Sequence, residues 1–212
     1  MTDVDALPTP DWLAPTQPRP TAVGEPRIPI RQDWWYRAIT SRKLPGTPPA
    51  VPALSRADVW APGADVFTLL WRTLAWGSGR YLRQNSRRLD SIKADPHRVE
   101  KTLTEAATWA GRDPGRAFAA FRPDRRNRIP GLGPSFFTKF LYFAGGGAPD
   151  HPSLILDRVV ATALRDRCGW MSLHRTGPWP PETYERYCTL LARWAKDLGC
   201  APDEVELALF TR

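Results

Sequence analysis

The segment Ile129-Pro130-Gly131-Leu132-Gly133-Pro134-Ser135, followed directly by the apolar run Phe136–Phe143, decides how the rest of the sequence is interpreted. Two glycines spaced two apart allow backbone conformations that side chains forbid, and they let a ligand approach bare amides. Pro134 suits the first position of a helix, where a proline loses no hydrogen bond. The unpaired amides of that first turn and the helix dipole attract an anion, for which phosphate is the natural candidate. An ordinary glycine turn between two core helices is the alternative, and the short motif alone does not exclude it.

A single carboxylate follows about two dozen residues later in the chain. Asp157 comes after three apolar residues, Leu154-Ile155-Leu156, and directly before an expected helix from Arg158 to Arg167. One role for Asp157 is to cap that helix, because an aspartate side chain accepts hydrogen bonds from the first free amides. The other role is catalytic, since the apolar residues before it would let its charge act through a low dielectric. The two roles are compatible.

Composition indicates a folded and basic protein. The chain has 212 residues, of which 42% are apolar, so it is long enough and apolar enough to bury a core. Its 30 Lys and Arg outnumber 22 Asp and Glu, and the formal net charge is +8. Arginine supplies most of the positive charge, which favours forked recognition of phosphate. Nucleic acid is therefore the leading class of partner; the resemblance given below implies double-stranded DNA, which we expect a monomer to bind.

The cysteines indicate neither disulfides nor a metal centre. Cys168, Cys188 and Cys200 are odd in number and widely spaced, unlike a disulfide framework or a zinc or iron–sulfur motif. We therefore expect a reduced, cytoplasmic protein that uses no organic cofactor and binds no metal through its side chains. The N-terminus lacks a signal-peptide pattern, and no apolar run approaches the length needed to span a membrane.

The chain divides into an N-terminal arm, residues 1–55, and a helical domain, residues 56–212. The arm holds eleven of the 23 prolines, so we predict an extended segment that sustains neither a helix nor a central strand. Tryptophans within the arm indicate that parts of it pack on the rest of the protein. Few stretches alternate as strands do, so the predicted fold is all-α and two-lobed.

Aspartates and prolines mark where the helices of the domain start. Asp65 precedes an apolar pattern that runs to Trp76-Gly77-Ser78-Gly79, and Asp95-Pro96 starts a helix that ends near Ala110. Asp113-Pro114 starts a short helix in the same way. Further helices are predicted at 136–143, 158–167, 182–198 and from Pro202 onward.

Two groups of arginines lie near these turns. The first follows the glycines at 77 and 79, and the second directly precedes the glycine turn, within a predicted hairpin at about 122–144. The first group is Arg80, Arg83, Arg87 and Arg88, and the second is Arg122, Arg125, Arg126 and Arg128. A solvated helix face explains the first group as well as DNA contact does. Positive charge directly before a phosphate-binding turn favours the second group as a DNA contact.

The combination of Ile129-Pro130-Gly131-Leu132-Gly133, a helix, and Leu156-Asp157 at the start of another helix resembles the helix–hairpin–helix DNA glycosylases. More narrowly, the stretch from Gly133 to Phe143 is similar to a bacterial branch with the 8-oxoguanine glycosylase fold. Leu74-Ala75-Trp76-Gly77-Ser78-Gly79 and Leu154-Ile155-Leu156-Asp157 fit that branch too. The resemblance covers roughly residues 55–212, and the arm lies outside it.

The resemblance implies roles for single residues. Gly131, Gly133, Ser135 and Arg128 would bind a DNA phosphate, with a monovalent cation possible at the hairpin carbonyls. Asp157 would serve the excision chemistry. Ser135 stands where bifunctional members carry a nucleophilic lysine, which resembles the monofunctional branch in which water attacks.

Lys139 lies one helical turn beyond Ser135, so we expect both side chains to project from the same face of the helix into one cavity. A base or phosphate contact, covalent attack on the sugar, and a structural ion pair are all open for it.

Base extrusion calls for a wedge or a stacking surface. The resemblance places Trp76 and Gly77 in the loop that probes the duplex or lines the base pocket, although Trp76 is equally well a core residue. Phe210 is expected to face the base.

The sequence therefore predicts a DNA glycosylase that leaves an abasic site, with Asp157 and Lys139 as the catalytic candidates. The target base stays open between an oxidised purine and a bulky modified base such as some phages use, so both repair and phage defence are possible. A non-catalytic DNA-binding module, a bifunctional enzyme that uses Lys139, and a helical protein-interaction domain are the alternatives.

Overall fold

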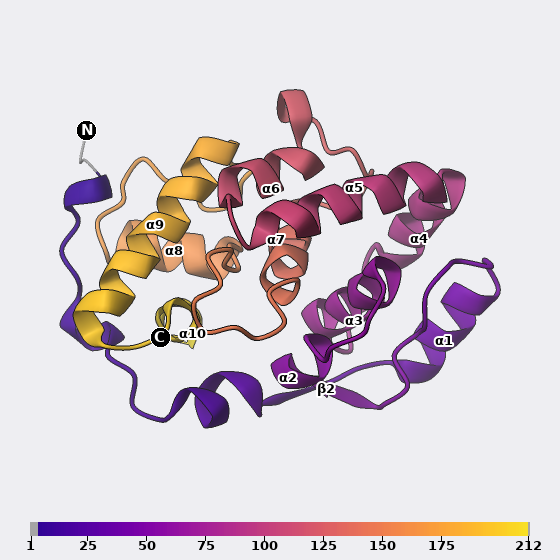
Figure 1. The fold of residues 1–212 in the computed structure, drawn as a ribbon, viewed down its shortest axis with the longest axis horizontal. Helices are drawn as coiled ribbons and strands as arrows, with labels where there is room; N and C mark the ends of the chain where they lie inside the picture. The colour runs from indigo at the N-terminus through magenta and orange to yellow at the C-terminus, as the bar shows by residue number, and fades with distance from the viewer. Residues whose placement is uncertain (1–3, 212) are drawn as a thin grey trace.

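A computed structural model describes residues 4–211, and helices make up most of that range (Figure 1). The all-α class predicted from the sequence is confirmed. The helices are α1 (Gln32–Thr40), α2 (Arg56–Val59), α3 (Val66–Ser78), α4 (Asn85–Ala94), α5 (Pro96–Ala110), α6 (Pro114–Phe121), α7 (Pro134–Phe143), α8 (Arg158–Asp166), α9 (Pro181–Leu198) and α10 (Pro202–Thr211). Short helical turns are η1 (Val4–Ala6), η2 (Asp11–Leu13), η3 (Pro20–Gly24) and η4 (Pro123–Arg125). The strands β1 (Arg27–Pro29) and β2 (Ala53–Ser55) form an antiparallel pair, with Ile28 opposite Leu54.

Aspartates start four of the helices, as the sequence predicts. Asp65 accepts hydrogen bonds from the amides of Phe67 and Thr68 at the start of α3. Asp95, Asp113 and Asp157 cap α5, α6 and α8 in the same manner. Because each cap satisfies amides that have no partner inside the helix, these caps fix where the loops end and the helices begin.

Helix α7 lies at the centre of the molecule, between α8–α10 on one side and α1–α4 on the other (Figure 1). It packs against α3, α5 and α6, and almost every side chain after Phe136 is buried. Phe137 stacks on Phe121 with ring centroids 4.9 Å apart and meets the edge of Phe118 at 4.7 Å. The apolar sequence of α7 thus reflects a helix that is surrounded by the core. This core is continuous across both lobes.

The prediction that the arm sustains no helix is wrong. Helix α1 forms within it because no proline occurs between Pro29 and Pro45, and this interval is long enough for two helical turns. Trp35 of α1 is fully buried in the core. The arm runs along the lower edge of the molecule in Figure 1, from the lobe of α9 and α10 to the lobe of α1.

Helix α4 was not predicted either. Between Arg80 and Arg88 the sequence is mostly arginine and polar residues, with Leu82 as the one aliphatic side chain, yet α4 begins at Asn85 after Gln84 adopts a left-handed conformation. Leu89 and Ile92 on its inner face are fully buried. Only one short apolar stripe marks this helix, so its sequence pattern is dominated by the charged outer face.

Candidate active site

The glycine turn forms a tight connection into α7. Gly131 has φ +81°, a conformation that side chains rarely adopt, and its carbonyl accepts a hydrogen bond from Arg88 Nε at 2.8 Å. Gly133 has no such backbone constraint, and a Cβ added there would meet no protein atom within 4 Å. The space next to Gly133 is therefore open to a ligand. Unlike α8, helix α7 starts without a side-chain cap.

Helix α7 and the start of α8 bring Lys139 and Asp157 together. Lys139 Nζ lies 3.0 Å from Asp157 Oδ2 and donates a second hydrogen bond to the Ser135 carbonyl at 2.9 Å. The other carboxylate oxygen, Asp157 Oδ1, accepts from the amides of Val159 and Val160. The side chains are 10% and 14% exposed, so the ion pair is largely withdrawn from water but still reachable. Asp157 thus caps α8 and also faces Lys139.

The strand-like segment before Asp157 is held from several sides. Thr138 Oγ1 lies within hydrogen-bond distance of both the carbonyl (3.1 Å) and the amide (3.2 Å) of Leu156. Two buried tyrosines of α9 donate to the two preceding carbonyls of the segment, Tyr187 to Ile155 at 2.6 Å and Tyr184 to Leu154 at 2.7 Å. Because these bonds join α7 and α9 to one short segment, the Asp157 carboxylate is fixed before any ligand arrives.

The environment keeps Asp157 ionised. Burial alone would raise the pKa of its carboxyl, but the Lys139 ammonium and the hydrogen bonds from the α8 amides outweigh this effect, and the pKa lies below its usual value. The resting site therefore presents a carboxylate next to an ammonium group.

This pair opens into a cavity of about 520 Å³. The walls are mostly apolar and come from α3, α7, α10, the segment before α8 and the N-terminal arm. The lining residues are Ala22, Val23, Pro26, Ile28, Arg56, Trp76, Gly77, Ser78, Gly79, Lys139, Ile155, Asp157, Glu206, Leu207, Phe210 and Thr211. Such a volume lies within the range of about 300–1,000 Å³ that is common for small-molecule sites.

Trp76 is placed in the wall of the cavity and not in a probing loop. Its ring meets Phe143 edge to face at 5.2 Å, and its indole nitrogen is buried. This packing favours the wall of the cavity, which is one of the positions that the sequence left open for Trp76, and the wedge role stays a prediction that the packing does not favour. Phe210 also lines the cavity and is 46% exposed.

Gly77 makes room for the Lys139 side chain. A Cβ at Gly77 would lie 3.1 Å from Lys139 Cδ and 3.1 Å from Phe136 Cε1, closer than ordinary contacts. Glycine at this position therefore lets the stem of Lys139 pass along α3 into the cavity.

Sequence reasoning missed a second ion pair in the cavity. Arg56 Nη1 lies 2.8 Å from Glu206 Oε2, and both side chains are buried. The Arg56 guanidinium also lies over the rings of Trp76 and Tyr142, at 5.4 and 5.1 Å from their centroids. Burial raises the pKa of Glu206, although Arg56 opposes this effect. No motif connects residue 56 to residue 206, so only the fold reveals the pair.

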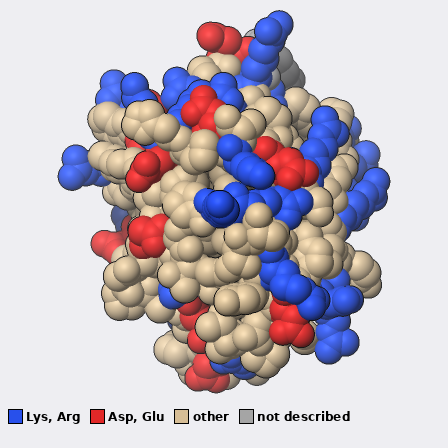
Figure 2. All heavy atoms as spheres, turned by 90° about the vertical axis from the view of Figure 1, so that its right-hand side faces the viewer, with Lys and Arg blue, Asp and Glu red and all other residues tan. Residues whose placement is uncertain are grey.

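The arginines predicted to contact DNA differ in their surroundings, because some bind other parts of the protein and others are exposed to solvent. Arg88 is buried over the ring of Phe136, with its guanidinium carbon 4.1 Å from the centroid, so it supports the turn and does not face solvent. Arg128 pairs with Glu105 at 3.0 Å. Arg126 is exposed, and the side chain of Arg125 lies outside the described residues. On the side that carries α1 and α4, Lys and Arg gather along the right-hand margin (Figure 2).

A highly exposed aromatic side chain lies between α3 and α4. Tyr81 is 84% exposed, two positions after Gly79 and between the exposed Arg80 and Arg83 in sequence. Its exposure is unusual for a large aromatic residue. The sequence, which also contains ten tryptophans, does not indicate which aromatic side chain is exposed.

The carbonyls of Ile129, Gly131 and Gly133 in the turn all accept hydrogen bonds from within the chain, and Arg88 already brings a positive charge to Gly131. Within residues 4–211, no group of three or more His, Cys, Asp or Glu side chains is arranged to hold a metal ion. A monovalent cation at the hairpin carbonyls stays a prediction.

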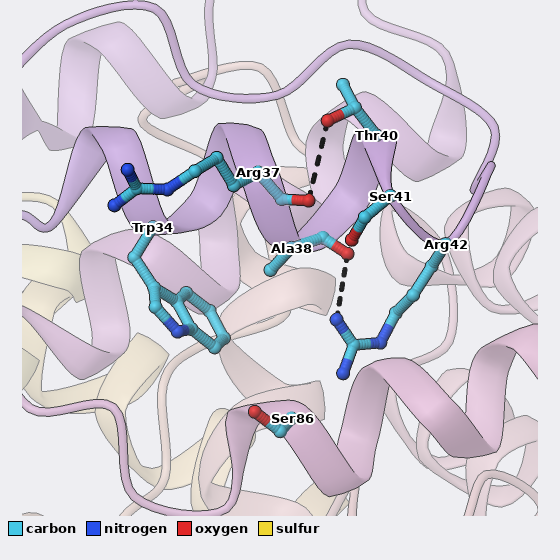
Figure 3. A pocket seen from close by; sticks show the side chains of 7 residues that line it. All are labelled: Trp34, Arg37, Ala38, Thr40, Ser41, Arg42 and Ser86. Atoms are coloured by element: carbon cyan, nitrogen blue, oxygen red, sulfur yellow. Dashed lines mark hydrogen bonds between the residues drawn. The ribbon is translucent and has the colours of Figure 1, made fainter.

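A second hollow lies between α1 and α4 (Figure 3). Figure 3 shows Trp34 and Arg42 on its rim, where Arg42 donates to the carbonyl of Ala38 and also pairs with Asp90 at 2.7 Å. No carboxylate or lysine lines this hollow, and it shares no residue with the cavity around Lys139.

Comparison with known proteins matches residues 21–210 to the family described as "Putative 8-oxoguanine DNA glycosylase OGG-like protein". The chain belongs to this family. The match begins at residue 21 and so includes most of the arm that the resemblance left out. No curated protein and no solved structure matches the chain. Membership implies DNA as the partner, and in the described part of the chain no helix is long and apolar enough to cross a bilayer.

Proposed function

We propose that the protein is a monofunctional DNA glycosylase. It hydrolyses the N-glycosidic bond of a damaged or modified base that has been flipped out of duplex DNA into the cavity around Lys139 and Asp157. The observation that carries this proposal is the Lys139–Asp157 pair at 3.0 Å, which lines a cavity of about 520 Å³ and whose lysine lies on α7 six positions after Gly133 of the glycine turn. Family membership supports the same conclusion.

Asp157 suits the demands of this reaction. When the bond between C1′ and the base nitrogen breaks, positive charge develops on the sugar, and a fixed carboxylate stabilises it. A water oxygen then bonds to C1′, one water proton is lost, and the departing base takes up a proton. The lowered pKa of Asp157 ensures that the carboxylate is charged at neutral pH. Lys139 would orient the carboxylate and contact the leaving base. The chemistry requires no organic cofactor.

The apolar walls and the volume of the cavity favour a base with a bulky substituent. The family description names 8-oxoguanine, so an oxidised purine is the other candidate. The cavity would select either base by its shape and not by hydrogen bonds from Arg56 or Glu206, because these two side chains are already paired to each other. The same cavity could serve DNA repair or defence against phages with modified DNA.

Base extrusion also needs a side chain that occupies the gap in the duplex. We assign this role to Tyr81 because it is the large aromatic that the loop between α3 and α4 presents to solvent. Gly133 and the first amides of α7 would bind the backbone phosphate, with Ser135 and Arg128 beside them.

The decisive experiment uses a panel of duplexes, each with one damaged or modified base. The protein is incubated with each duplex, and abasic sites are scored by alkaline strand cleavage. Abasic sites on one or more duplexes support the proposal, and the duplex that reacts identifies the base. Salt-dependent DNA binding without abasic sites on any member of the panel would instead identify a non-catalytic DNA-binding module. An absence of DNA affinity at low salt would identify a protein-interaction domain.

A bifunctional enzyme is the second candidate, and the position of Lys139 favours it. If the Lys139 amine loses a proton, its nitrogen can bond to C1′ as the base leaves, and a Schiff base with the opened sugar follows. Borohydride reduces such an adduct to a stable one. A trapped adduct that disappears in Lys139→Ala would establish this chemistry, and its absence during active base removal would establish attack by water.

A further inference from the structure

The N-terminal arm builds one wall of the cavity. Ala22 and Val23 of η3, followed by Pro26 and Ile28, line the same space as Lys139 and Asp157. We call residues 20–28 the strap. Its downstream end is fixed by the β1–β2 pair, in which Arg27 also donates to the carbonyl of Ala53. The shape of the cavity therefore depends on where the strap lies.

Arg19 fixes the upstream end of the strap. Its Nε donates to Asp203 Oδ1 at 2.9 Å and its Nη2 to Asp203 Oδ2 at 2.7 Å, a two-pronged contact. Nη2 also donates to the Gly147 carbonyl at 3.1 Å, and the guanidinium lies 5.7 Å from the Trp60 ring centroid. Strap residue 20 follows directly, so this one side chain determines how the chain enters the wall.

Asp203 joins three elements that line the cavity. It lies in the first turn of α10, the helix that carries Glu206 and Phe210. The Tyr142 hydroxyl of α7 donates to Asp203 Oδ2 at 2.8 Å. Tyr142 lies three positions after Lys139, slightly less than one helical turn. Strap, α10 and α7 thus meet at one buried carboxylate.

Arg19 supplies the polar contacts that join the upstream end of the strap to α10 and to the Gly147 carbonyl, whereas η3 itself packs against α10 and α2 with Val23 buried. The nearest earlier anchor is Leu13, which is buried in the core. Between Leu13 and Arg19 the chain passes over a hollow of about 240 Å³ lined by residues 14–17 and α10. Loss of the Arg19 contact would therefore remove the polar anchor of residues 20–25 and leave Leu13 and the β1–β2 pair in place.

We infer that Arg19 is a positioning residue that holds the strap as the wall of the base cavity and so determines how firmly a flipped base is held. This inference rests on the proposed function. Arg19 lies outside the residues 21–210 that match the family, so the family description does not assign it.

Hydrogen exchange tests the strap without any substrate. Arg19→Ala and Arg19→Lys are compared with Arg175→Ala, which breaks a similar two-pronged contact to Asp166 on the surface. We expect amide exchange in residues 21–25 to become about tenfold faster or more in Arg19→Ala, intermediate in Arg19→Lys and unchanged in Arg175→Ala, whereas the β1 amides should not change in any variant. Unchanged exchange in Arg19→Ala overturns the inference, whatever the activity of the protein.

Kinetics test the effect on the base. On a duplex that the wild type processes, Arg19→Ala should lower the single-turnover rate about tenfold or more, because a loosely held base rarely reaches the reactive geometry. Affinity and binding stoichiometry for a duplex with a tetrahydrofuran abasic analogue should not change, since that duplex places no base in the cavity. A rate loss matched by an equal loss of binding-competent protein would overturn the inference in favour of general unfolding. If the wild type removes no base, the proposed function fails and the exchange result alone decides the role of Arg19.

Discussion

The ammonium of Lys139 and the carboxylate of Asp157 neutralise each other across 3.0 Å in the resting protein. Because Oδ1 of the same carboxylate is bound by the α8 amides, Asp157 cannot swing away when Lys139 moves. In the reaction that we propose, a base in the cavity attracts the lysine and leaves the carboxylate where it is, so that the carboxylate faces the sugar with less of its charge compensated.

Asp157→Asn should abolish most base excision while DNA binding survives. Asparagine still caps a helix, so α8 should form normally, but the charge that stabilises the sugar cation is lost. We expect single-turnover rates to fall by about 10²–10³-fold or more. Asp65→Asn, which alters an equivalent cap at α3 away from the cavity, is the control and should keep its rate. Full activity in Asp157→Asn would contradict the proposed mechanism.

The ionised Asp157 carboxylate should also contribute to the free energy of unfolding, and this contribution should decrease at acid pH. Its pKa in the unfolded chain is about 3.9, and the folded value is lower. The stabilisation is therefore complete above the unfolded pKa and is lost as pH falls through the folded pKa. The difference in free energy of unfolding between wild type and Asp157→Asn, measured by denaturant titration, should be constant near neutral pH and shrink below about pH 4. A difference that instead grows toward acid pH would contradict a lowered pKa.

Tyr81→Ala should reduce excision from duplex DNA more than excision from single strands. A single strand has no stacked partner to displace, so it needs no side chain to hold the gap. Stability should hardly change, because Tyr81 is 84% exposed. Tyr36→Ala removes another exposed tyrosine, on α1, and should affect neither substrate. Equal losses on both substrates would assign Tyr81 a role other than holding the duplex open.

Gly133→Ala should weaken DNA binding without destabilising the fold. The added methyl group meets no protein atom and the backbone at Gly133 is extended, so the variant should fold as the wild type does. The methyl group would occupy the space that a phosphate needs to reach the α7 amides. Affinity for an abasic-analogue duplex, measured by anisotropy at fixed salt, should fall. Gly63→Ala lies in open space elsewhere and controls for the loss of a glycine, although its positive φ adds strain. Unchanged affinity would place the phosphate elsewhere.

Local patterns in the sequence predict much of this fold. Aspartates before prolines mark the starts of α5 and α6, and the apolar stretch after Gly133 marks α7. A structural ion pair was one of the roles that the sequence left open for Lys139, and the structure pairs it with Asp157. These features are local, or belong to a motif whose parts lie within thirty residues.

The remaining features depend on contacts between distant residues. Arg56 and Glu206 are 150 positions apart, and Arg19 and Asp203 are 184 apart, so no spacing rule connects them. Trp76 was ambiguous because a tryptophan at the end of a helix can either pack or project, and its neighbours Phe143 and Arg56 decide the matter. Helix α1 was missed because the prolines on both sides dominated the composition of the arm.

Helix α7 begins at the glycine turn, to which we assign a DNA phosphate, and carries Lys139 five positions after Pro134, a rise of about 7.5 Å along the helix axis. The same helix is tied to the cavity wall by Tyr142. If DNA is bound at the turn, the reacting sugar must lie at a fixed spacing along the strand from the bound phosphate. A modified base too near the end of a strand to have a phosphate at that spacing would then escape removal, even if it fitted the cavity perfectly.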